Sequence, residues 1–81
     1  MSNIEEKILA KGLSPPGPLL VVKKRLQEGI KAPHVRIIVS NPESVDELVA
    51  YFRERGVETT TDRAGEDYHV IADLTTFREE V

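Results

Sequence analysis

The segment from Gly12 to Leu20 has the clearest chemical pattern in the chain, with three prolines and two glycines in nine residues. Proline fixes the backbone and removes an N–H donor, while glycine lets a second group approach closely. Such a turn before a helix can position a nucleophile or hold an anion. Its one hydroxyl, on Ser14, has no basic neighbour in the sequence. The Gly-Lys-Ser or Gly-Lys-Thr that completes a phosphate loop does not follow.

The prolines have two interpretations. They form either a rigid loop on which a partner docks or a turn that leads from a strand into a helix. Pro18 suits the first turn of a helix, where its missing N–H is no loss. We favour the structural role, because the segment is short for polyproline recognition.

The same segment resembles the Gly-x-x-Cys-Pro-x-Pro motif of the TusA/SirA family of small sulfur-carrier proteins. Gly12, Pro16 and Pro18 occupy the matching positions, and Pro15 stands at the position of the motif cysteine. Further on, residues 40–44 are similar to the Asp-Pro-x-Ser segment of the family. Gly56 matches the glycine after its second helix, and residues 68–71 match its final strand. The resemblance covers nearly the whole chain and implies the order β-α-β-α-β-β.

In that family the motif cysteine receives sulfur as a persulfide and passes it to a partner. A thiol at a helix N-terminus has a lowered pKa, which populates the nucleophilic thiolate. This chain contains no cysteine, and Pro15 has no nucleophilic atom. Leu9 stands three positions before Gly12, where many members carry an acid. The resemblance therefore implies a degenerate motif at Gly12, Pro15, Pro16 and Pro18, no catalytic residue and no cofactor.

Hydrophobic spacing predicts the same elements from the residues alone. The pattern favours strands over residues 4–10, 35–39, 57–62 and 67–74, and helices over about 18–27 and 44–55. Together they predict an α/β (α+β) two-layer sandwich, with a four-stranded mixed sheet and two helices on one face. We expect a single domain over residues 1–81, in which residues 75–81 form a flexible tail.

Local signals set the boundaries and the buried faces. Ser44 and Glu47 have capping-box spacing, so we expect Ser44 to cap the second helix, and Gly56 to end it. Residues 63–66 are expected to form a hairpin loop. The expected inward-facing side chains are Leu19, Val22, Leu26 and Ile30 in the first helix, Val45, Leu48, Val49 and Phe52 in the second, and Val35, Ile37 and Val39 in the strand between them.

Composition excludes several classes of protein. At 81 residues, 40% hydrophobic and 31% charged, the chain matches an ordinary globular domain. It has no apolar run of the ~20 residues that a membrane helix needs, and its N-terminus lacks a secretory signal, so we expect a cytoplasmic location. Without cysteine it has no disulfide or thiolate zinc site. His34 and His69 are the only histidines, and their spacing does not indicate a metal site.

Charge is divided between the two halves of the chain. Residues 1–40 carry a net charge of +4 and residues 41–81 a net charge of −7. This asymmetry indicates either a partner surface or two solvated faces. Ile38 and Ile71 are expected on the open sheet face near Leu9, where an apolar patch would favour a homodimer or a partner unless long side chains shield it. The candidate partner surface comprises Lys23, Lys24, Arg25, Ile38 and Ile71, and Lys31, His34 and Arg36 extend its basic part.

These observations favour a non-catalytic TusA/SirA-like protein that acts as a protein-interaction or regulatory module. One alternative is an accessory protein of sulfur or selenium metabolism that works with a thiol-bearing partner. The other is RNA binding through the basic first helix. The chain's pI of about 5.3 and its four aromatic residues argue against nucleic acid.

Overall fold

The computed structural model describes residues 5–76 and contains the predicted order of elements. Four strands and two helices are followed by one short 3-10 turn, η1. Their bounds are β1 Glu5–Ala10, α1 Gly17–Glu28, β2 His34–Val39, α2 Pro42–Glu54, β3 Thr59–Ala64, β4 Asp67–Asp73 and η1 Leu74–Thr76.

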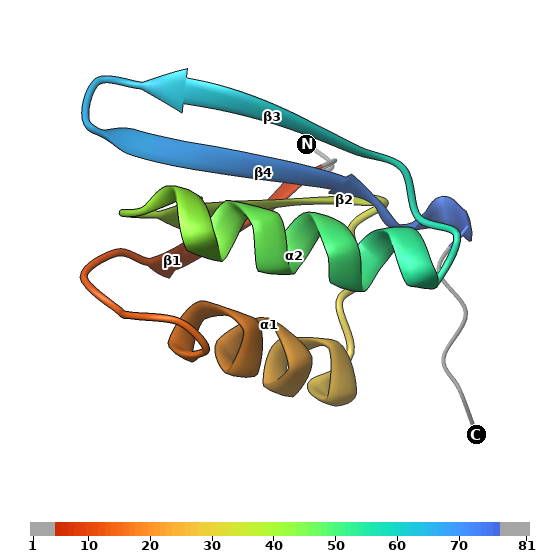
Figure 1. Cartoon of the computed structure of the whole chain (residues 1–81). Helices are drawn as coiled ribbons and strands as arrows, with labels where there is room; N and C mark the ends of the chain where they lie inside the picture. The colour runs from red at the N-terminus through yellow and green to blue at the C-terminus, as the bar shows by residue number, and fades with distance from the viewer. Residues whose placement is uncertain (1–4, 77–81) are drawn as a thin grey trace.

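The strands form one mixed sheet in the order β1-β2-β4-β3. β1 and β2 are parallel and are joined through α1, whereas β4 runs antiparallel to both of its neighbours. Both helices cover the same face of the sheet (Figure 1). The predicted two-layer sandwich with a four-stranded mixed sheet is therefore confirmed. The other face of the sheet has no helix over it in the part of the chain that the structure describes.

The core lies between the helices and the sheet. Strand residues alternate between the two faces, so every second side chain points toward the helices. As predicted, Val35, Ile37 and Val39 of β2 are fully buried. From the helices, Val22, Leu26, Leu48 and Phe52 are buried in the core, while Leu19, Ile30, Val45 and Val49 are only half-buried. Pro18 is also buried and occupies the first turn of α1 as predicted.

The start of α2 differs from the prediction. The helix begins at Pro42, and the side chain of Asn41 accepts a hydrogen bond of 3.0 Å from the N–H of Ser44. Ser44 thus lies inside the first turn and is fully buried, so its predicted role as the N-cap is wrong. Asn41 prevails because asparagine is an equally good cap and proline at the next position is already set for the helix.

The terminal hairpin is tighter than predicted. Arg63 and Ala64 belong to β3, so only Gly65 and Glu66 connect it to β4. Gly65 has φ +64°, a left-handed conformation that glycine adopts without strain. β3 begins at Thr59 and not at residue 57, because Val57 turns inward and is buried where the chain leaves α2.

The remaining boundaries lie close to the predicted ones. Of the predicted tail, residues 75 and 76 belong to η1, where Thr75 donates two hydrogen bonds to Asp73, and residues 77–81 lie outside the described residues. Ile4, the predicted start of the first strand, also lies outside them. Across residues 5–76, no helix has the length and apolar character needed to cross a membrane.

Candidate functional site

The proline-rich turn lies at the carboxyl end of β1 and is tied to the neighbouring loop after β2. The N–H of Gly12 donates a 2.8 Å hydrogen bond to the hydroxyl of Ser40. One residue further along in each loop, the side-chain amide of Asn41 donates to the carbonyl of Leu13 at 3.4 Å. Parallel strands end at the same edge of a sheet, which brings these loops and both helix N-termini together. Gly12 has φ +80°, so the turn requires a residue that tolerates this conformation.

The turn is also braced from within. The N–H of Gly17 donates to the carbonyl of Ser14 at 2.7 Å, and the N–H of Leu20 donates to that of Pro16 at 3.0 Å. The peptide bond between Pro15 and Pro16 is cis. The turn is thus hydrogen-bonded both within itself and to the loop after β2.

The turn presents apolar side chains and no nucleophile with a base. Pro15 is half-buried, at the position that the resemblance gives to the cysteine. The Ser14 hydroxyl is exposed, and among residues 5–76 no basic side chain is hydrogen-bonded to it. Leu13 is 39% exposed and Leu20 is 57% exposed. Leu13 also packs on Gly17, where an added Cβ would come within 3.1 Å of the Leu13 Cβ. The large side chains that the turn exposes are thus apolar, beside the small Ser14 hydroxyl.

Replacing Asn41 by alanine is expected to destabilise the protein by about 1 kcal/mol, because the variant loses the cap of α2. It also loses the contact that ties the two loops together. The matched change is Ser44→Ala, which is expected to cost less, since the buried Ser44 hydroxyl has no hydrogen-bond partner within the described residues. Urea unfolding of both variants checks this order. A larger loss for Ser44→Ala would restore the serine as the cap.

The open sheet face carries a polar cluster that unites three strands. Arg36 of β2 donates to both carboxylate oxygens of Glu5 on β1, at 2.8 and 3.4 Å. Its Nη1 lies 2.8 Å from Nδ1 of His69 on β4. A guanidinium can only donate, so Nδ1 of His69 accepts and the ring proton sits on Nε2. The hydrogen bond that Arg36 donates to Glu5 lowers the pKa of Glu5 and raises the pKa of Arg36.

The Glu5–Arg36 pair is expected to make the free energy of unfolding depend on pH in the acidic range. Because folding lowers the pKa of Glu5, the contribution of the pair is present above the ordinary glutamate pKa of about 4.3 and is lost as the pH falls through the folded value. Glu5→Gln should therefore reduce the loss of unfolding free energy between about pH 5 and about pH 2.5. Urea unfolding at both pH values measures this difference. Equal acid sensitivity in the variant and the parent would contradict it.

The predicted apolar residues of the open face are partly shielded. The register sets Leu9 beside Ile38, whereas Ile71 lies opposite Arg36. Leu9 is 71% exposed, but Ile38 and Ile71 are half-buried. The shielding alternative is therefore the closer description of the two isoleucines, and Leu9 at the edge strand is the exposed apolar residue.

The five residues of the predicted partner surface lie on two sides of the molecule. Lys23, Lys24 and Arg25 belong to α1, and Ile38 and Ile71 lie on the opposite face of the sheet. Arg25 is ion-paired with Glu6 and Glu28. Lys23 lies 5.5 Å from the centre of the Tyr51 ring. The structure therefore separates the basic part of this surface from its apolar part.

The other basic residues and the histidines also separate. His34 and Arg36 lie on the open sheet face, and Lys31 belongs to the loop between α1 and β2. The His34 Nε2 is 3.9 Å from Asp73 Oδ1, while His69 contacts Arg36. Hydrogen bonds from Thr75 lower the pKa of Asp73. Within residues 5–76, no three His, Asp or Glu side chains are grouped so that they could hold a metal ion.

The sequence did not indicate two features of the site. Ser40 and Asn41 hold the proline turn, and a hollow opens on the far side of α2 between Val45 and Tyr68. An asparagine directly before a proline is a helix-start signal and could have identified Asn41. The hollow has no local signal, because its walls come from a helix and two strands.

Comparison with known proteins supports the fold. No family model and no curated protein matches the chain by sequence. Among solved structures, the chain is similar to a SirA-like protein from Desulfitobacterium hafniense, with a TM-score of 0.72 and 25% sequence identity. The match covers 83% of this chain and 93% of that one. The chain therefore has the SirA-like fold that its proline motif and element order predict, and it has this fold without a cysteine.

Proposed function

We propose that this chain is a non-catalytic protein with the SirA-like fold that acts as a protein-interaction or regulatory module. One observation carries the proposal: the proline turn is anchored through Gly12 and Ser40, yet it has Pro15 where a sulfur carrier needs a thiol, and it exposes Leu13 and Leu20. A sulfur relay through the turn requires a nucleophile, and Pro15 has none.

The apolar surface of the turn supports an interaction role. Leu13 and Leu20 are exposed large hydrophobic side chains on either side of the three prolines. A rigid turn loses little conformational entropy when it binds, so less of the favourable binding free energy is lost to ordering the turn. We define Leu13, Pro15 and Leu20 as the turn surface. A protein partner with an apolar contact region fits it better than a nucleic acid does.

The two alternative functions would use different surfaces of the molecule. An accessory role in sulfur or selenium metabolism needs a partner that supplies the thiol, with this chain docked through the turn surface. RNA binding would use Lys23 and Lys24, which are both exposed on α1. The observed separation of these lysines from Arg36 reduces the continuous basic area available to a phosphate backbone. A cytoplasmic location is part of the proposal, and a homodimer is an alternative to a different protein partner; the test needs neither.

Photo-crosslinking from the turn surface tests the proposal. A crosslinker placed at residue 20 in extract of the source organism is expected to give one protein adduct, which Leu13→Asp removes. A crosslinker at Ala50, an exposed position on α2, is the matched control and should not give that adduct. An adduct that is insensitive to Leu13→Asp, or salt-sensitive capture of RNA through Lys23 and Lys24, would contradict the proposal.

A further inference from the structure

The edge strand β3 (Thr59–Ala64) is the least covered strand of the sheet. Residues 60–64 are all exposed, and only Thr59 is half-buried. Figure 1 shows β3 at the margin of the sheet, beyond β4. An edge strand of this kind offers unpaired N–H and C=O groups to which another strand can add.

One hydrogen bond determines which groups of β3 point outward. The N–H of Asp73 donates to the carbonyl of Glu58 at 3.0 Å, and these two residues continue the register of β3 with β4 by one pair beyond Thr59 and Ala72. Opposed residues in an antiparallel ladder alternate between bonded and non-bonded pairs. The even-numbered residues of β3 therefore bond to β4. The odd-numbered residues, Thr59, Thr61 and Arg63, direct their N–H and C=O groups away from the sheet.

The available part of this edge is short and well defined. The carboxylate of Asp62 accepts the N–H of Arg63 at 2.9 Å, which leaves Thr59 and Thr61 as the residues with N–H groups open to a further strand. β3 contains no proline or lysine, and its register with β4 has no bulge. The opposite edge strand, β1, begins with three charged residues, Glu5–Lys7, which are a usual protection against strand addition.

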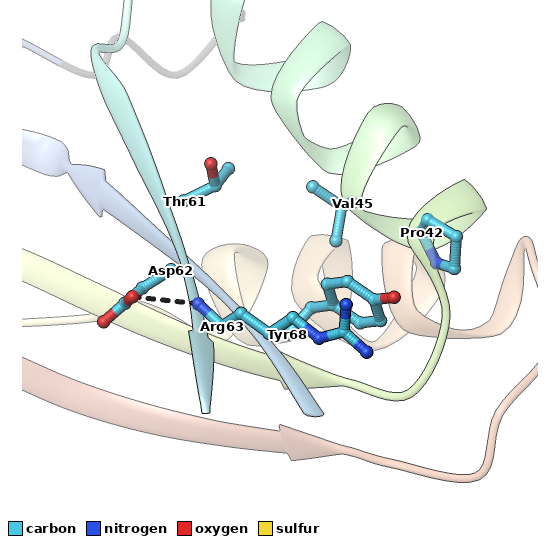
Figure 2. Close-up of a pocket in the computed structure, with 6 residues that line it drawn as sticks. All are labelled: Pro42, Val45, Thr61, Asp62, Arg63 and Tyr68. Atoms are coloured by element: carbon cyan, nitrogen blue, oxygen red, sulfur yellow. Dashed lines mark hydrogen bonds between the residues drawn. The ribbon is translucent and has the colours of Figure 1, made fainter. Parts of the chain in front are cut away.

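A hollow of about 340 Å³ lies on the helix-facing side of β3 (Figure 2). Pro42 and Val45 of α2 and the ring of Tyr68 form its apolar walls. Figure 2 shows Arg63 extending beside Tyr68, with Asp62 directed to the other side of the strand. The guanidinium carbon of Arg63 is 5.0 Å from the centre of the Tyr68 ring. Among residues 5–76, no carboxylate forms an ion pair with Arg63.

We propose that β3 and this hollow, together the β3 groove, bind an extended segment of a partner protein that adds to the sheet as a fifth strand. Opposite Thr61 the segment carries an aliphatic side chain, which enters the hollow, and opposite Arg63 it carries an acidic one. The inference rests on the proposed interaction function and assigns it a class of partner. The groove is built on β3 and the turn follows β1, and these strands are the opposite edges of the sheet, so the two surfaces are probed by separate substitutions and each proposal can fail alone.

A second copy of the chain fits the groove less well than such a segment. Two β3 strands that pair antiparallel about Thr61 would set Arg63 of each copy beside Thr59 of the other. Arg53 and Glu58 both line the adjoining hollow with Thr59. The pairing would thus set a threonine, and no acidic side chain, opposite Arg63, so it lacks the charge pair that an acidic partner segment supplies.

A defined peptide tests the β3 groove. The probe is a nine-residue capped peptide of threonine and valine, with leucine at its centre and glutamate two positions to either side, so that one glutamate meets Arg63 in either strand direction. Titrated into the full chain and followed by NMR, it should slow amide exchange at Thr59 and Thr61. The same peptide with lysine in place of glutamate should bind about fivefold more weakly.

Two variants and one matched control sharpen the result. Arg63→Glu should reverse the preference between the glutamate and lysine peptides, while Lys24→Glu, the same charge change on α1, should leave it intact. Thr61→Pro removes an outward N–H without a ladder bond and should weaken binding about tenfold or more. If that variant does not fold, the reversal by Arg63→Glu still decides the proposal.

Three outcomes would overturn the inference. They are no binding at millimolar peptide, binding that leaves the Thr59 and Thr61 amides unprotected, and equal affinity for the two peptides. Self-association that protects these amides would assign the edge to a second copy instead. None of these results alters the crosslinking result from the turn surface, so a failure here is distinguishable from a failure of the proposed function.

Discussion

Replacing Phe52 by alanine is expected to leave the chain largely unfolded at 25 °C. Phe52 is fully buried on α2 against the sheet and is the largest side chain in the core. Truncating a buried phenylalanine to alanine costs about 3–5 kcal/mol, because both the transfer free energy and the packing around the cavity are lost. A domain of this size has a total stability of about 3–5 kcal/mol, so the variant retains little of it. Circular dichroism with urea titration measures the loss.

The control for this change is Leu20→Ala. Leu20 lies on α1 and is 57% exposed, so its truncation is expected to change stability by about 0.5 kcal/mol or less. A Phe52→Ala variant that unfolds at nearly the same urea concentration as the parent would show that this core does not hold the two layers together.

Introducing a thiol at the proline turn is expected to recover reactivity without sulfur transfer. Pro15 lies just before the first turn of α1, which begins at Gly17, so Pro15→Cys puts a thiol near the positive end of the helix. The pKa of this thiol should fall below the ordinary value of about 8.5. Alkylation by iodoacetamide at pH 7 should then be about threefold to tenfold faster than at an ordinary exposed thiol.

The matched variant is Ala50→Cys, at an exposed position in the middle of α2. Its thiol has no helix N-terminus beside it and sets the reference rate. Equal alkylation rates and equal pH midpoints in the two variants would mean that the turn is no longer an activating site, although its backbone is intact. Efficient sulfur transfer by the Pro15→Cys protein would show instead that the turn lacks only its thiol.

The order of helices and strands in this fold can be predicted from local signals in the sequence. The alternation of Val35, Ile37 and Val39 marks a half-buried strand, and Gly56 marks the end of α2 without any knowledge of the rest. Proline at position 18 indicates the start of α1 for the same reason. Because each element carries its own pattern and its own end signals, the order β-α-β-α-β-β follows from short segments.

Features that depend on pairing between distant segments could not be predicted from the sequence. The contact of Glu5 with Arg36 requires the register of β1 against β2, and that of Arg36 with His69 requires the register of β4. No short pattern specifies those registers. Two local signals also competed at the start of α2, where Asn41 and Ser44 are both good caps. Proline after the asparagine decided between them.

In the candidate site, too, local features could be predicted from the sequence and long-range contacts could not. The proline turn could be identified from its residues, but the bond from Gly12 to Ser40 joins positions 28 residues apart and appears only in the fold. The predicted basic and apolar surface was divided because α1 and the open face lie on opposite sides of the sheet. The β3 groove was not predicted, since the Tyr68 and Val45 walls meet only when α2 packs beside the hairpin.

A sulfur-relay assay tests the central claim, that the turn keeps its structure without sulfur-carrier chemistry. The parent chain is incubated with a cysteine desulfurase, radiolabelled cysteine and an acceptor, and label is followed on the chain and on the acceptor. The proposal predicts no label on the chain and no change in the rate at which the acceptor is labelled. Stoichiometric label on the chain, or faster delivery to the acceptor that Leu13→Asp abolishes, would contradict it.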